Sequence, residues 1–457
     1  MEQKKSAAVI LGLTDSGERI PSAAGRISTQ PGTACEIFAK STDGEKNASL
    51  IGKVTSSGHN STIEHTVFNL AFENVSVFAE QFLIEFRLAS FTVKSRRYVD
   101  FADSGYYIPD SLTGALREKY TAHMDRLFRD YARLCELGVP KEDARFVLPY
   151  CLHSNFYCTV NAREFLNMLT QMLYGRGAKY PELKTLGESL LAQAKNITPG
   201  IMTDFEKRAQ KKAEPTLPLL DFVHTVHTEE QKVALLGATP DAAKTVTVAA
   251  LTVSDGDFTV GDAFAIAGQK ENRRKMIRYL LDSPRPRALE NVNYTYAVRR
   301  ISLSCLTHFA RHRMQSIQIP DLANAKKEFV LPETVRQSAD REKIYTDCFS
   351  ATAALKAAFT EAGVEARELV YLALSGNTID IITTMNAREL LLFFTLRCCN
   401  RAQWEIRDYA DEMLRLARQA EPEIFQFFGP SCFVGACPEG RMSCGKQKEV
   451  REKYLAL

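Results

Sequence analysis

Apolar and polar positions follow one order along the chain, and that order occurs twice. In the first half, a short apolar stretch at residues 8–13 predicts a β-strand. Residues 68–72 then alternate between apolar and polar side chains, which is typical of a half-buried strand. In the second half, residues 245–251 predict the opening strand and residues 292–296 show the same alternation. Each half therefore begins with two predicted strands.

Helical spacing follows the second strand in each half. Leu303, Leu306 and Phe309 recur at intervals of three, which predicts an amphipathic helix. A long helix is expected over residues 110–137 and a short strand near residues 146–148, and a final helix begins at an Asn-Ala-Arg string in both halves. This mixture predicts an α+β fold, in which long helices pack on a mixed sheet.

Three short segments recur at nearly constant spacing, so the chain reads as two diverged copies of one fold. They are Leu50–Glu64 with Lys275–Glu290, Glu85–Ser90 with Arg311–Ser316, and Thr159–Glu164 with Thr384–Glu389. We expect residues 1–205 to form the first copy, residues 206–243 a linker, and residues 244–457 the second copy with a cysteine-containing tail. The charged run at residues 206–214 predicts a solvated helix within the linker.

Composition and charge exclude several classes of protein. The chain has 457 residues and a formal net charge of +3, which gives no reason to expect binding to nucleic acid or to a membrane surface. No apolar run approaches the roughly 18 residues that span a bilayer, so a cytoplasmic location is expected. The eleven cysteines read as reduced thiols. Cys432, Cys437 and Cys444 would need a fourth ligand from elsewhere to hold a metal ion, and no metal site is predicted.

Two cationic strings are candidates for binding an anion. Arg311-His312-Arg313 follows a predicted helix and offers adjacent donors that can grip an anion, although a surface basic cluster would have the same composition. Ser95 and Arg97 share one face of an extended segment, which would suit a phosphate.

The two final helices carry polar residues at helical spacing. Asn386 and Arg397 return to nearly the same face, and Arg163 and Asn167 share a face at four-residue spacing. Solvent-facing positions would more often be Lys or Glu than Asn, so these residues are candidates for ligand binding.

Taken in order, these strings resemble motifs of the flavin-dependent thymidylate synthases. The strings are His59-x-Ser61-x-x-Glu64-His65, Ser95-x-Arg97-Tyr98, Ala144-Arg145-Phe-Val-Leu-Pro149, Arg311-His312-Arg313, and Asn386-Ala-Arg388 through Arg397 to Arg407. The Gly429–Gly445 tail also resembles tails found in that family. The resemblance covers almost the whole chain, twice.

The resemblance implies a function. The family converts deoxyuridylate (dUMP) to thymidylate (dTMP), with methylene-tetrahydrofolate as carbon donor and FAD reduced by NADPH as hydride source. Its members are homotetramers with sites between subunits, so the resemblance implies a homodimer of this duplicated chain that mimics a tetramer.

The resemblance also assigns roles to particular residues. Arg311 and Arg397 become the candidate catalytic residues. The candidate flavin-binding residues are Arg311, His312, Arg313, His59, Ser61, Asn161, Arg163, Asn167, Asn386 and Arg388. The candidate nucleotide-binding residues are Ser95, Arg97, Tyr98, Arg145 and Arg397.

Neither copy keeps the full family pattern. In the first copy, Glu85-Phe86-Arg87 replaces the Arg-His-Arg triplet and Met172 replaces the Arg that faces the base. The second copy departs at other positions, with Asp321-Leu-Ala323 after Pro320 in place of Ser-x-Arg, Arg285 in place of the His, and Leu392 in place of the helix Asn. The losses are complementary, which predicts a division of labour between the copies.

The split pattern leaves three functions open. The chain is a thymidylate synthase with altered contacts, a non-catalytic flavin- or nucleotide-binding or regulatory descendant, or an enzyme for one-carbon transfer to another pyrimidine nucleotide.

Overall fold

The computed structural model describes residues 4–97, 99–102, 104–212 and 231–457. It divides into two compact units, which we call the first and second unit. The first unit is Met1–Thr225 with Leu331–Gly376, and the second is Val226–Val330 with Asn377–Leu457. A segment of the second copy therefore folds together with the first copy.

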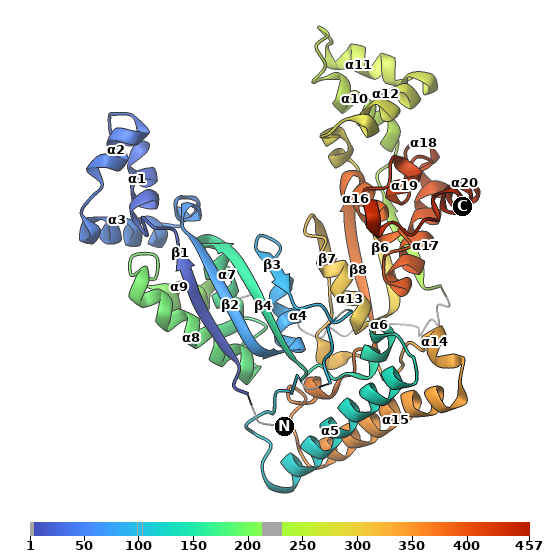
Figure 1. The fold of residues 1–457 in the computed structure, drawn as a ribbon. Helices are drawn as coiled ribbons and strands as arrows, with labels where there is room; N and C mark the ends of the chain where they lie inside the picture. The colour runs from blue at the N-terminus through green and yellow to red at the C-terminus, as the bar shows by residue number, and fades with distance from the viewer. Residues whose placement is uncertain (1–3, 98, 103, 213–230) are drawn as a thin grey trace, which may run out of the picture. The chain divides into compact units, whose positions relative to one another are not determined.

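The first unit is built on a four-stranded sheet with the strand order β1-β2-β4-β3 (Figure 1). The strands are β1 (Ala7–Leu13), β2 (Val67–Ser76), β3 (Ser90–Val93) and β4 (His153–Asn161). Every pair in this sheet is antiparallel, where a mixed sheet was expected. The alternation of apolar residues in β2 turns Phe68, Leu70 and Phe72 into the core.

The second unit repeats this sheet with the order β5-β6-β8-β7, again antiparallel throughout. Its strands are β5 (Val233–Ala238), β6 (Asn293–Ser302), β7 (Gln315–Gln318) and β8 (Thr378–Asn386). The irregularities recur too, because Asn74 in β2 and Arg300 in β6 both have positive φ, of 50° and 55°, where the register shifts. The repeated topology confirms the duplication and the α+β class.

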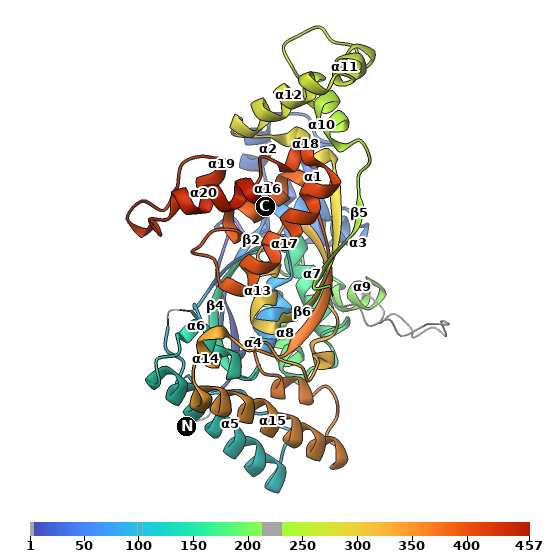
Figure 2. The ribbon, with the colours of Figure 1, turned by 90° about the vertical axis from the view of Figure 1, so that its right-hand side faces the viewer.

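Helices cover both sheets. In the first unit they are α1 (Arg19–Ile27), α2 (Ala34–Lys40), α3 (Gly44–Ser56), η1 (Asn60–His65), α4 (Val77–Ile84), α5 (Gly114–Glu136), α6 (Lys141–Ala144), η2 (Arg145–Val147), α7 (Ala162–Leu173), α8 (Pro181–Ile197), α9 (Phe205–Lys212), α14 (Glu333–Arg336), α15 (Ala339–Glu361) and η5 (Leu369–Leu372). In the second unit they are α10 (Ala242–Leu251), α11 (Val260–Ala267), α12 (Lys270–Asp282), η3 (Arg287–Asn291), α13 (Leu303–Ala310), η4 (Leu322–Asn324), α16 (Ala387–Arg397), α17 (Trp404–Ala420), α18 (Pro422–Phe425), α19 (Ser431–Val434), η6 (Gly440–Met442) and α20 (Gln447–Ala456). Helices α7 and α8 pack on the first sheet, and α16 and α17 pack on the second (Figure 2).

The prediction of a strand is wrong at two places. Residues 245–251 lie in α10, and residues 146–148 lie in and just after the 3₁₀ turn η2. The first strand of the second copy is β5, which begins at Val233 inside the segment expected to be a linker. The charged run of that segment does form a helix, α9, and residues 213–230 lie outside the described part of the chain.

A buried carboxylate anchors the same corner of each sheet. Ser76 donates from its amide and its hydroxyl to Glu182, at 2.8 and 2.6 Å, and its own hydroxyl caps α4. Ser302 makes the same pair of bonds to Glu405, at 2.7 and 2.5 Å, and caps α13. Burial raises the pKa of Glu182, and the bonds from Ser76 oppose that rise. The two copies therefore share buried polar contacts as well as topology.

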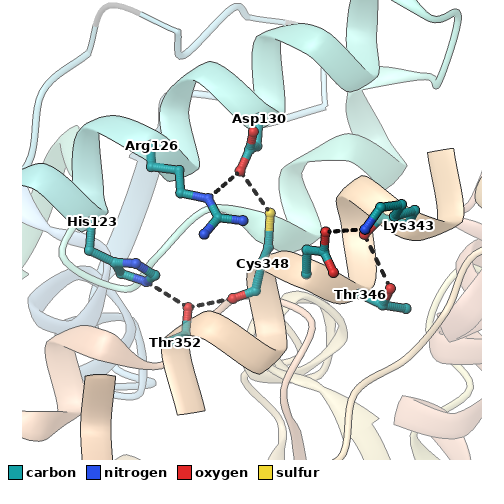
Figure 3. Close-up of polar contacts among 8 residues, drawn as sticks. His123, Arg126, Asp130, Lys343, Thr346, Cys348 and Thr352 are labelled. Carbon is teal, nitrogen blue, oxygen red and sulfur yellow. Dashed lines mark hydrogen bonds and ion pairs between the residues drawn. The ribbon is translucent and has the colours of Figure 1, made fainter. Parts of the chain in front are cut away.

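The long helices of the two copies, α5 and α15, pack against each other within the first unit (Figure 3). Nε2 of His123 lies 2.8 Å from the hydroxyl of Thr352, which itself donates to the Cys348 carbonyl at 2.7 Å. Because the Thr352 hydroxyl proton is used in that bond, Nε2–H of His123 is the donor to the Thr352 oxygen. Asp130 accepts from Arg126 at 3.2 Å and from the Cys348 thiol at 3.5 Å. Polar contacts therefore set the register of this helix pair.

In the part of the chain that the structure describes, no helix is long and apolar enough to cross a membrane.

Candidate functional site

A chain of three polar side chains connects the end of α13 to α16 in the second unit. His312 follows α13 and is buried. Its Nδ1 lies 2.9 Å from Oε1 of Glu389, and its Nε2 lies 2.9 Å from Nε of Arg397. Arg397 also reaches the His308 carbonyl at 3.4 Å. Glu389 and Arg397 stand at opposite ends of α16, so the imidazole connects both ends of that helix to the end of α13.

These contacts define the protonation state of the imidazole. The guanidinium of Arg397 can only donate, so Nε2 of His312 accepts and carries no proton. Nδ1 then carries the proton and donates to Glu389. Burial lowers the pKa of His312; the Glu389 hydrogen bond opposes that change and the Arg397 charge adds to it. The site therefore presents a neutral histidine with a fixed tautomer and a guanidinium held in one orientation.

The first copy has lost this arrangement at two positions together. Phe86 and Met172 stand where His312 and Arg397 stand, and both are buried. The remaining carboxylate, Glu164, accepts instead from Asn167 Nδ2 at 3.3 Å. Removing only one of the two polar partners would leave the other buried without a hydrogen bond, which is costly. The paired replacement confirms that the two copies differ at the centre of the motif.

The flanking arginines of the triplet, Arg311 and Arg313, are both exposed on either side of buried His312. Arg311 is the C-cap residue of α13. The second unit thus gathers Arg311, His312, Arg313, Asn386, Arg388 and Arg397, and the first unit holds the other predicted residues that the structure describes.

The Asn-Ala-Arg strings have a structural role in both copies. Asn161 and Asn386 are the N-cap residues of α7 and α16, and their side-chain oxygens accept from backbone amides at 3.0 and 2.8 Å. Arg163 pairs with Glu64 at 2.7 Å, and Arg388 forms the matching ion pair with Glu290. The ion pair occurs at the same place in each copy, which supports the alignment of the two motifs.

The first unit contains a pocket of about 440 Å³ beside α7. This volume lies within the usual range of small-molecule sites. Its lining residues are Asn60, Leu88, Arg163, Glu164, Leu166, Asn167, Thr170, Phe205, Arg208, Ala209 and Lys212. Two predicted flavin-binding residues, Arg163 and Asn167, therefore line one cavity. The predicted residues His59 and Ser61 are exposed and do not line it, whereas Asn60 between them does.

Sequence reasoning missed the contribution of α9 to this pocket. Arg208 and Lys212 are one turn apart on that helix and both line the cavity. Their i, i+4 spacing within a basic run was the available signal, but the run predicted only a solvated helix. Oδ1 of Asn60 and Nε of Arg208 are buried and have no hydrogen-bond partner in the described part of the chain. Both residues line the cavity, where a water molecule or a polar ligand would satisfy such atoms.

Three predicted nucleotide-binding residues of the first copy lie around Glu142. Arg97 forms an ion pair with the Glu142 carboxylate at 2.7 Å, and Nε of Arg145 donates to the Glu142 carbonyl at 3.1 Å. The Ser95 hydroxyl accepts from the Arg97 amide at 3.3 Å. The structure therefore brings Ser95, Arg97 and Arg145 together. Tyr98 lies outside the described residues.

The cysteine-containing tail packs beside the turn after α16. Arg401 donates to the carbonyls of Met442 and Ser443, at 2.8 and 3.4 Å, so it holds that loop in place. Burial raises the pKa of the Cys432 thiol, and neighbouring Cys399 contributes to that rise. Among the residues that the structure describes, no three metal-binding side chains are gathered in positions to share an ion.

Comparison with known proteins decides the family. The model of the thymidylate synthase complementing protein family matches residues 10–200 and again residues 234–423. The chain belongs to this family of flavin-dependent thymidylate synthases. A flavin-dependent thymidylate synthase of Geobacter sulfurreducens is 34% identical over 239 residues, which is 50% of this chain and 99% of that protein.

Other members of the flavin-dependent thymidylate synthase family match in the same way. The enzyme of Clostridium tetani is 31% identical over 49% of this chain and 97% of its own length, and that of Thermococcus onnurineus is 34% identical over 49% and 96%. A single family chain thus corresponds to about half of this protein. The crystal structure of a UMP/dUMP methylase from Streptomyces cacaoi covers 45% of this chain and 96% of its own, with 22% identity and a TM-score of 0.39.

Proposed function

We propose that this protein is an FAD-dependent thymidylate synthase. It methylates dUMP to dTMP, with methylene-tetrahydrofolate as the carbon donor and NADPH as the source of reducing equivalents. The observation that carries the proposal is the double match of the family model, over residues 10–200 and 234–423. The relatives that match along almost their whole length are named flavin-dependent thymidylate synthases.

The pocket beside α7 supports flavin binding in the first unit. Its lining includes the cations Arg163, Arg208 and Lys212 against one carboxylate, Glu164. The buried polar atoms of Asn60 and Arg208 that lack a hydrogen-bond partner support a polar ligand here. When bound, the flavin supplies the hydride chemistry, and the protein supplies binding and orientation.

The second unit supports a role in holding and polarising an anionic or carbonyl-bearing group. His312 accepts from Nε of Arg397, so the guanidinium is fixed in one orientation. An arginine held in this way loses less conformational freedom when it binds a ligand. In the proposal Arg397 faces the nucleotide base, and exposed Arg311 lies at the junction of flavin and nucleotide.

Arg97, Ser95 and Arg145 are the proposed phosphate-binding residues. Arg97 is paired with Glu142 in this structure. A nucleotide phosphate would compete with that carboxylate for the guanidinium, and Arg binds phosphate through two parallel donors. Glu142 therefore keeps Arg97 oriented in the absence of substrate.

One observation favours a second candidate function. Phe86 and Met172 replace the polar pair of the second copy, so the first copy cannot reproduce the His312–Arg397 contact. If no chemistry remains, the protein is a flavin- or nucleotide-binding or regulatory descendant. If the changed contacts alter specificity alone, it transfers one carbon to another pyrimidine nucleotide.

Product analysis separates these functions. We expect purified protein with FAD, NADPH and methylene-tetrahydrofolate to convert dUMP to a product with the mass and retention of dTMP. UMP and dCMP are assayed in parallel as alternative substrates. Methylation of one of these in place of dUMP would support altered specificity, and binding of flavin without any methylated product would support the descendant.

The proposal includes a cytoplasmic homodimer. Because each chain carries two copies of a unit that the resemblance places in tetramers, two chains would supply four copies. Light scattering should give a mass of about twice the 51.2 kDa of one chain. A mass of one or four chains would contradict this part of the proposal.

A further inference from the structure

Helix α9 forms one wall of the pocket beside α7, and it lies just beyond residues 10–200, where the first match of the family model ends. The helix packs against α7 and buries Phe205 and Ala209. Arg208 and Lys212 occupy the neighbouring positions of the same helix and line the cavity. This wall of the cavity therefore comes from residues outside the two matched ranges.

Some charged side chains that line the pocket have a charged or polar side chain as partner, whereas Arg208, among the residues that the structure describes, has only neutral carbonyl groups. Arg163 has an ion-pair partner in Glu64, and Glu164 accepts from Asn167. Arg208 donates through Nη2 to the carbonyls of Ile201 and Thr203, at 3.1 and 2.8 Å, which are neutral acceptors.

Neither Arg208 nor Lys212 forms an ion pair with a carboxylate in the ranges that the structure describes. Burial lowers the pKa of the Arg208 guanidinium, and the negative charge of Asp204 opposes that change only in part. An anion in the pocket would offset the cost of burying the Arg208 charge.

We propose that Arg208 and Lys212 of α9 bind the phosphate groups of the flavin nucleotide in the first unit. The inference rests on the proposed function, since it takes the flavin as the ligand of this pocket. The chemistry favours phosphate as the contacting group. Arg presents a planar fork of donors to phosphate oxygens, and Lys adds a point charge on a flexible stem. The riboflavin part of the ligand is neutral and would lie against α7, where Asn167 and Thr170 offer hydrogen bonds and Leu166 offers apolar surface.

Three flavins separate a phosphate contact from a general effect on the pocket. Riboflavin carries no phosphate, FMN carries one, and FAD carries two. The full chain is titrated with each flavin and binding is followed by flavin fluorescence. We expect Arg208→Gln and Lys212→Gln to weaken FAD and FMN at least about tenfold, and to leave riboflavin binding within about twofold of the unsubstituted protein.

A matched control lies on the same helix. Lys207 is exposed and does not line the pocket, so Lys207→Gln removes the same charge from another face. We expect it to leave all three affinities unchanged. Arg208→Gln also removes two contacts to the preceding turn, whereas Lys212 is an exposed residue at the end of α9. Lys212→Gln therefore tests the inference even if Arg208→Gln fails to fold.

The outcomes distinguish this inference from the proposed function. If the unsubstituted protein binds FAD and Lys212→Gln binds it equally well, the phosphate contact is wrong and the proposed function stands. Equal weakening of riboflavin and FAD would show that α9 only shapes the pocket, which also overturns the inference. If the unsubstituted protein binds none of the three flavins, both the inference and the proposed flavin chemistry fail.

Discussion

Nε of Arg397 donates a hydrogen bond to Nε2 of His312 over 2.9 Å. This contact joins the last residue of α16 to the residue after the C-cap of α13, and it holds the imidazole neutral with its proton on Nδ1. At the matching positions of the first copy the chain has Met172 and Phe86. The two copies therefore fill the same place with a polar pair in one case and an apolar pair in the other.

The first prediction concerns the coupling of this pair. Arg397→Met leaves Nε2 of His312 buried without a donor, and we expect it to lower the free energy of unfolding by about 1–3 kcal/mol. The double variant His312→Phe, Arg397→Met reproduces the pair found in the first copy, and should recover part of that loss. Urea unfolding of the two single variants and the double variant gives the coupling energy as a double-mutant cycle. Strictly additive effects would show that the two residues do not depend on each other.

The second prediction separates capping from ligand binding at Asn386. Its side-chain oxygen accepts from the Glu389 amide at 2.8 Å, so Asn386→Ala should cost about 1 kcal/mol of stability. Asn386→Asp keeps the acceptor and should retain most of the stability. Thermal unfolding of both variants provides the measurement. If the alanine variant is as stable as the unsubstituted protein, the cap does not contribute to stability and Asn386 serves ligand binding alone.

The third prediction is a pH dependence at the α5–α15 contact. Burial lowers the pKa of His123 to about 4, from an ordinary value of 6.5. Between these values the unfolded chain binds a proton that the folded chain does not, so stability is full above pH 6.5 and falls as the pH is lowered toward 4. The loss attributable to this group should approach about 1.4 kcal/mol per pH unit.

The variant His123→Gln isolates this effect from other titrating groups. It removes the titration, so the difference in unfolding free energy between the unsubstituted protein and the variant should shrink or reverse below pH 6.5. His153, whose pKa burial also lowers to about 4, titrates in both proteins and cancels in the difference. A difference that does not change with pH would contradict the lowered pKa.

The fourth prediction exchanges a residue between the copies. Asn167 lines the pocket of the first unit, and Leu392 holds the same position in the second copy. Asn167→Leu should weaken FAD binding about tenfold, because a hydrogen-bonding group is lost from the wall of the cavity. Leu166→Met, at a neighbouring lining position, keeps the apolar surface and should have little effect. Unchanged FAD affinity in Asn167→Leu would place the flavin elsewhere.

Much of the fold could be predicted because its local patterns agree with its packing. The alternation at residues 68–72 and 292–296 places one face of β2 and of β6 in the core. The stretch at residues 245–251 shows the opposite case, since residues 245–248 are four consecutive β-branched residues, which favour a strand. Ala243, Val246 and Ala250 instead bury one face at helical spacing, so α10 forms. Tertiary packing overrides local propensity there.

The candidate site could be predicted where its residues belong to strings that resemble the family's motifs. The strings around His312 and Asn386 drew attention to the contact between α13 and α16, and the structure brings these residues together. The residues of the pocket wall were missed because Asn60 and Arg208 meet only after the chain has folded back on itself. The resemblance pointed to His59 and Ser61, which are exposed, and not to Asn60 between them, which lines the pocket.

The most direct test of the account is the release of tritium from dUMP labelled at C5 of the base. The full chain is incubated with FAD, NADPH and methylene-tetrahydrofolate, and Arg311→Gln serves as the comparison. We expect tritium to appear in water only when the folate is present, and Arg311→Gln to reduce the rate at least about tenfold. Absence of release from folded, flavin-loaded protein would contradict the assignment as a thymidylate synthase.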